Sequence, residues 1–118
     1  MKTFDITGKD GRVCAFEVSN IHIGRGGLCR LVKTIHGVTI IRDPSKFRWS
    51  LENQDEFCEF EMNGVRFVAW EPWGDNSRYW VGPKVEEGKE PESTDEITII
   101  RDTFLRARAF FGIVTVNK

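Results

Sequence analysis

The sequence contains few of the residues that build metal and nucleophilic sites. Only two histidines are present, His22 and His36, and no HExxH motif or similar pairing accompanies them. A metal site would have to be assembled from distant parts of the chain. We therefore predict no metal site and no cofactor.

Cysteine is also scarce, with three residues at Cys14, Cys29 and Cys58 and no CxxC pair. An odd number without such a pair argues against a disulfide framework and against a zinc site built from thiolates. Each cysteine lies in a run of core-like residues, so we predict that all three are buried, reduced thiols.

Long apolar runs and an excess of one charge are both missing. No stretch resembles a signal-peptide core or approaches the roughly 20 apolar residues of a membrane span, so we expect a soluble, cytoplasmic protein that makes no membrane contact. The 17 basic and 18 acidic residues give a net charge of -1. They are interleaved along the chain, which makes nucleic acid an unlikely partner because duplex binding needs clustered cations.

What the sequence does contain is core material for one domain. Hydrophobic residues make up 40% of the 118 residues and include nine Phe and four Trp. A chain of this length folds as a single domain with one core. We therefore treat residues 1–118 as one domain, with the charged, Pro-containing segment 83–93 as a mobile loop.

Two hairpins are expected from alternating apolar residues. The first joins residues 3–7 to 13–18 through the turn "GKDG". The second is "FCEFEMNGVRFVAW", in which Asn63-Gly64 favours a type I′ turn. Counting outward from this turn predicts Met62–Val65, Phe60–Phe67 and Cys58–Ala69 on one face, and Glu61–Arg66, Glu59–Val68 and Phe57–Trp70 on the other.

A first helix is predicted over residues 27–36. Leu28, Leu31, Val32 and Ile35 recur at helical spacing, and Gly37 offers a left-handed C-cap. A hairpin turning at His36-Gly37 is the competing interpretation, because the β-branched run 38–41 follows directly.

A second helix is predicted over residues 94–111. Ser93-x-x-Glu96 reads as a capping box, and Gly112 would close the helix. The apolar stripe consists of Ile97, Ile100, Phe104, Ala107 and Phe111. This helix contains "TIIRD", which also occurs at residues 39–43, where we predict a strand. A rival interpretation makes residues 98–102 a strand, followed by a helix starting near Asp102.

Further strands are expected at "SRYWV" and "IVTVNK". The hairpins and the absence of a βαβ rhythm predict an α+β fold: a mainly antiparallel sheet of about five to seven strands with both helices on one face.

The register places an aromatic patch on the face away from the helices. Phe57, Val68 and Trp70 would share that face, with Trp73, Asp75, Arg78 and Trp80 in the segment that follows. Such a patch marks an interaction surface, a self-association face or a loop-covered face. We therefore predict a protein-interaction module, such as an inhibitor, an immunity-type protein or an adaptor, with a protein partner or a homodimer.

Two other functions stay open at this point. Glu71, Asp75 and Arg78 around the aromatic residues could form a small-ligand site or a hydrolase-like active site. Single-stranded nucleic acid could instead stack on the aromatic residues, with five cations along its backbone: Arg12, Arg25, Arg30, Lys33 and Arg42.

Overall fold

The computed structural model describes residues 1–43, 56–72, 77–86, 88–110 and 113–116, with the backbone alone for 109–110 and 113–116. Trp73 and Asp75 lie outside these ranges. No helix within the described ranges is long and apolar enough to cross a membrane.

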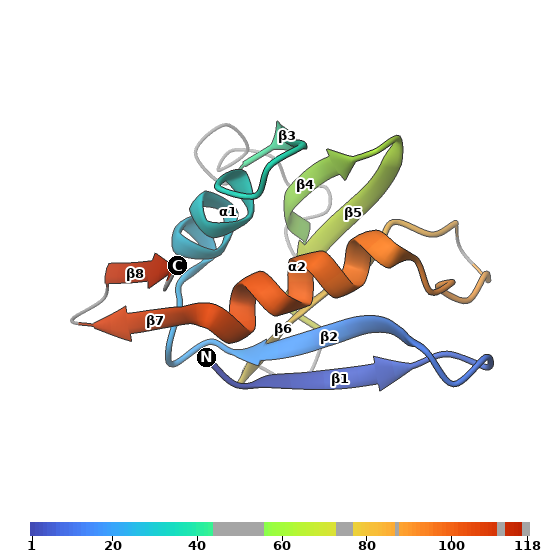
Figure 1. Ribbon diagram of the computed structural model, residues 1–118, viewed down its shortest axis with the longest axis horizontal. Coiled ribbons are helices and arrows are strands. Elements are labelled where there is room, and N and C mark those ends of the chain that lie inside the picture. Colours follow the sequence, from blue (N-terminus) through green and yellow to red (C-terminus); the bar gives the residue numbers. More distant parts are fainter. Residues whose placement is uncertain (44–55, 73–76, 87, 111–112, 117–118) are drawn as a thin grey trace.

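The architecture is a mainly antiparallel sheet with two helices, so the predicted α+β class is confirmed (Figure 1). The elements are β1 (Thr3–Thr7), β2 (Val13–Ser19), α1 (Arg25–Lys33), β3 (Val38–Arg42), β4 (Glu56–Met62), β5 (Val65–Trp70), β6 (Arg78–Pro83), α2 (Asp95–Arg106), β7 (Ala107–Phe110) and β8 (Ile113–Val116). Six strands form one sheet in the order β1-β2-β6-β5-β4-β3, and β7 pairs with β8 separately.

The turn between β4 and β5 fixes the register of this sheet. Asn63 has φ 53° and Gly64 has φ 79°, as a type I′ turn requires. All the predicted pairs from Met62–Val65 to Cys58–Ala69 are confirmed. The predicted Phe57–Trp70 pair is wrong, because a β-bulge makes Phe57 an extra residue and sets Glu56 opposite Trp70.

Helix α1 is confirmed in place of the competing hairpin, but it begins and ends earlier than residues 27–36. Its buried stripe is Leu28, Cys29, Leu31 and Val32. Thr34 is the C-cap, and its hydroxyl donates to the carbonyl of Leu31 at 2.6 Å. Gly37, with φ 89°, serves the turn into β3 instead.

The N-cap of helix α2 lies one residue after the predicted one. Thr94 is the N-cap, and its hydroxyl accepts a hydrogen bond from the backbone of Ile97 at 3.4 Å. Ser93, predicted as the capping residue, instead donates to Asp10 in the β1–β2 turn. Residues 98–102 are helical, so the rival interpretation of the second "TIIRD" as a strand is wrong.

The predicted end of α2 at residue 111 is also wrong. The helix ends at Arg106, and Ala107 is extended with φ -72° and ψ 144° as the first residue of β7. From Ala107 onward the backbone pairs with β8 instead of continuing the hydrogen bonds of the helix. The amino group of Met1 donates to the carbonyls of Phe104 and Leu105 in the last turn of the helix and to that of Ala107 just after it.

The hydrophobic core lies between the sheet and the helices. Phe16 on β2 meets Phe104 on α2 edge-on, with ring centroids 5.1 Å apart. Cross-strand partners continue this core face from Phe16 through Val81 and Ala69 to Cys58. The thiol of Cys58 in turn interacts with that of Cys29 on α1. The contacts described for both helices therefore reach the same side of the sheet, and α2 passes in front of β6 in Figure 1.

The cysteines belong to this interior, as predicted. Cys14, Cys29 and Cys58 are all free and buried. Burial raises the pKa of the Cys14 thiol, which donates to the carbonyl of Ile6.

Candidate interaction surface on the second face of the sheet

The sheet face opposite the core carries a pair of tryptophans at its centre. We call it the second face; strand register places on it Phe4, Ile6, Ala15, Glu17, Ser19, Arg42, Glu56, Glu59, Glu61, Arg66, Val68, Trp70, Arg78, Trp80 and Gly82, among others. Trp70 and Trp80 are directly opposed on β5 and β6. Their rings meet edge-on with centroids 6.1 Å apart, and both residues are half-buried.

Trp80 owes its position to a glycine. A Cβ atom at Gly82 would lie 2.5 Å from Cη2 of Trp80 and 2.8 Å from Cβ of Ala15. The indole therefore packs directly against Gly82, next to the fully buried Ala15. Only a residue without a side chain permits this approach.

A stacked arginine extends the surface toward β1. The guanidinium carbon of Arg78 lies 3.5 Å from the ring centroid of Phe4, in a cation–π contact. A guanidinium nitrogen lies 3.6 Å from a carboxylate oxygen of Glu17 on β2. These two contacts hold Arg78 against the face beside the tryptophans.

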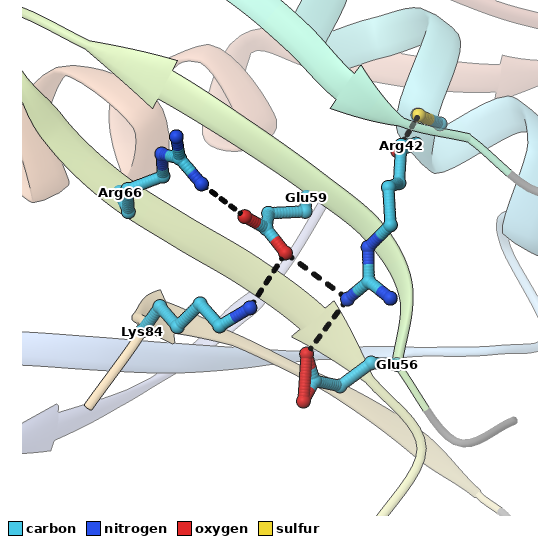
Figure 2. A network of polar contacts seen from close by, with 6 residues as sticks. Arg42, Glu56, Glu59, Arg66 and Lys84 are labelled. Carbon is cyan, nitrogen blue, oxygen red and sulfur yellow. Dashed lines mark hydrogen bonds and ion pairs between the residues drawn. The ribbon is translucent and has the colours of Figure 1, made fainter. Parts of the chain in front are cut away.

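A charged cluster borders the tryptophans on the other side. Figure 2 shows the carboxylate of Glu59 between three cations: Arg66 at 2.8 Å, Lys84 at 2.8 Å and Arg42 at 3.0 Å. Arg42 also reaches Glu56 at 3.1 Å. The side chain of Glu59 is only 3% exposed, so its charge depends on these partners.

The pKa of Glu59 reflects this competition. Burial by itself raises the pKa, but hydrogen bonds from Lys84 and Arg66, together with the charges of Lys84 and Arg42, outweigh it. The pKa therefore lies below its ordinary value, and Glu59 is ionised at neutral pH.

The second face is thus arranged in rows across β5 and β6. Trp70 lies opposite Trp80, and Val68 lies opposite Gly82. Beyond them, the backbone N–H of Lys84 donates to the carbonyl of Arg66 at 2.9 Å. Residues 66 and 70 are four positions apart on one strand, a separation of about 13 Å. The aromatic row of Trp70 and Trp80 and the cationic row of Arg66 and Lys84 are therefore close enough for one small partner surface to contact both.

The structure places three of the predicted site residues together on this face: Trp70, Arg78 and Trp80. Val68 shares the face but is buried. Phe57 belongs to the core, because the bulge turns it away from Trp70 and its ring meets Tyr79 edge-on at 4.9 Å. The guanidinium carbon of Arg25 lies 5.2 Å from the centroid of the Phe57 ring.

Several groups required by the two alternative functions form ion pairs with other residues of the chain. Glu71 accepts a hydrogen bond from Arg25 at 3.0 Å, whereas Arg78 lies against Glu17. Of the cations considered for nucleic acid, Arg12 pairs with Asp95, Arg25 with Glu71, and Arg42 with Glu56 and Glu59. Neither alternative gains support from these contacts.

Sequence reasoning missed Phe4, Glu59, Lys84 and Gly82 as parts of the surface. The hairpin count already placed Glu59 on the second face, and its charge among apolar neighbours was a usable signal. Phe4 and Lys84 join the surface only through the pairing of β2 with β6 and of β5 with β6, for which the sequence holds no local signal.

Within the described residues, no three His, Cys, Asp or Glu side chains are grouped as metal ligands. Comparisons with protein families, with curated proteins and with solved structures found no match to this chain.

Proposed function

We propose that this protein is an interaction module that binds another protein through the second face of its sheet. The observation that carries the proposal is the half-buried Trp70–Trp80 pair, flanked by the stacked Arg78, on the side opposite the face that both helices contact. A cytoplasmic inhibitor, immunity-type protein or adaptor would use such a surface.

The side chains fit this role in chemistry as well as in position. Trp and Arg are the residue types that contribute most to binding energy at protein interfaces. Both tryptophans are fixed by packing, since Trp70 abuts Trp80 and Trp80 covers Gly82. A partner therefore pays little conformational entropy to order them.

Affinity capture with matched variants tests the proposal. We expect Trp70→Ala and Arg78→Ala to lose partners that the wild-type protein retains under the same conditions. Leu105→Ala is the control, because Leu105 is an exposed apolar residue on α2, away from the second face. Thermal melts establish that each variant is folded. An identical set of partners for all three variants would contradict the proposal.

Light scattering measures the molar mass in solution and so tests whether the partner is a second copy of the chain. A dimer that Trp70→Ala dissociates and Leu105→Ala does not would place the homodimer interface on the second face. A dimer insensitive to both substitutions would place the interface elsewhere.

A further inference from the structure

Building on the proposed function, we infer the chemical class of the partner: an acidic polypeptide segment. Its carboxylates would pair with Arg66 and Lys84, while neighbouring apolar groups lie against Trp70 and Trp80. The inference rests on how the charges of the second face are layered.

On this face Arg66, Lys84 and Arg78 are each more exposed than the carboxylate that they pair with. The side chain of Arg66 is 54% exposed and that of Lys84 is 44% exposed, whereas Glu59, which holds both, is 3% exposed. The same order holds for Arg78, at 37%, over Glu17, at 22%. At these three positions an approaching molecule meets the cation before the carboxylate, and an acidic segment is the complement.

Arg66 and Lys84 have half-exposed side chains, so each can contact a partner's carboxylate while it stays next to Glu59. Glu59 would keep its contact with Arg42, which is more deeply placed and lies 3.0 Å away. The outer cations can therefore turn toward a partner's carboxylates without leaving Glu59 unpaired.

The same layering disfavours a polyanion such as nucleic acid. The carboxylates of Glu59 and Glu17 lie below their cations, and Glu56 lies beside Arg42; together they weaken the field of these cations at a distance. The net charge of the chain is -1, so no long-range attraction supports phosphate binding. Binding must therefore rest on short-range contacts. The row of Trp70 and Trp80 and the row of Arg66 and Lys84 are about 13 Å apart, which matches side chains four residues apart in an extended peptide.

Titration of the isotopically labelled protein with a blocked poly-glutamate peptide at low salt tests the inference by NMR. We expect amide shifts in β5 and β6, next to Arg66, Lys84 and the tryptophans. Arg66→Gln and Lys84→Gln together should weaken binding by about tenfold. Arg12→Gln is the matched control, because Arg12 is a similarly exposed, ion-paired cation that contacts α2; it should leave binding unchanged.

Glu59→Gln gives the sharpest expectation. It removes the internal carboxylate that competes for the outer cations, so poly-glutamate should bind about three- to fivefold more tightly. A merely structural role for Glu59 would instead leave affinity unchanged or lower it. Thermal melts of each variant at the titration temperature establish that it is folded.

Several results would overturn the inference. Absence of shifts with poly-glutamate, equal binding of poly-lysine, or tighter binding of oligothymidylate would each do so. Failure here is distinct from failure of the proposed function. Partners that depend on Trp70 but not on Arg66 and Lys84 would leave the interaction module standing with a different partner class.

Discussion

At the scale of single residues, Gly82 determines whether the aromatic surface can form. A Cβ atom there would fall on Trp80 and on Ala15, and the Ala15 contact cannot be relieved by rotating a side chain. We expect Gly82→Ala to destabilise the protein by about 1–3 kcal/mol through overpacking. Urea denaturation measures this, with Gly24→Ala as a reference: Gly24 lies in open space at the N-cap of α1, so only the smaller cost of Ala as a cap is expected there. An equal effect of both substitutions would contradict the assigned position of the Trp80 ring.

Glu59 is the residue whose charge couples stability to pH. Its pKa is lower in the folded protein than in the unfolded chain, where the ordinary value is 4.5. The folded state therefore binds fewer protons in this range, and the stabilisation is present above pH 4.5 and lost as the pH falls through the folded pKa.

We expect Glu59→Gln to lower stability by about 1–3 kcal/mol at neutral pH and to flatten the loss of stability below pH 4.5. Denaturation midpoints recorded across the acid range measure both effects. Glu92→Gln, in the exposed connection before α2, should leave the profile within about 0.5 kcal/mol of the wild type. A variant at position 59 with the wild-type acid profile would refute the assignment.

At the scale of elements, the residue that caps the start of α2 in the structure, Thr94, differs from the one predicted from the sequence, Ser93. Thr94 accepts from the backbone of Ile97, whereas Ser93 contacts Asp10. Thr94→Ala should therefore cost about 1 kcal/mol, and Ser93→Ala less than about 0.5 kcal/mol. Thermal and urea denaturation compare the two. The reverse order would restore Ser93 as the cap.

The end of α2 illustrates how an element is decided by its neighbours. The stripe from Ile97 to Phe104 is buried as predicted, but the spacing continues in the sequence past Arg106, where the helix stops. The segment "TIIRD" makes the same point, since it is strand in β3 and helix in α2. Local propensity differs too little between these states to resist tertiary contacts.

At the scale of the whole molecule, β6 joins the two halves of the sheet. It pairs with β2 of the first hairpin and with β5 of the second. The radius of gyration, 13.4 Å, is close to the roughly 13.5 Å of a single compact domain of this length.

We therefore expect one cooperative unfolding transition. Phe16→Leu, at the contact between β2 and α2, should lower stability by about 1–3 kcal/mol. The midpoints from tryptophan fluorescence and from far-UV circular dichroism should shift together. Separate transitions by the two probes would show that the halves of the sheet unfold independently.

The sequence predicted much of the fold because its signals there are local. Asn63-Gly64 sets both a turn and a register, and the first hairpin follows from alternation over a few residues. The surface was predicted less completely. Trp70 was placed on the second face by counting, but the same count failed at Phe57, where a bulge that leaves no local signal adds one residue.

The sequence by itself determined the α+β class, the buried thiols, and the face to which Trp70 belongs, because periodicity and turn chemistry act over short distances. Only the tertiary structure decided that Trp80 stands opposite Trp70, that Phe4 supports Arg78, and that Glu59 holds three cations. Those contacts join strands far apart in the chain. Their free energy depends on burial and charge in three dimensions, which no local pattern encodes.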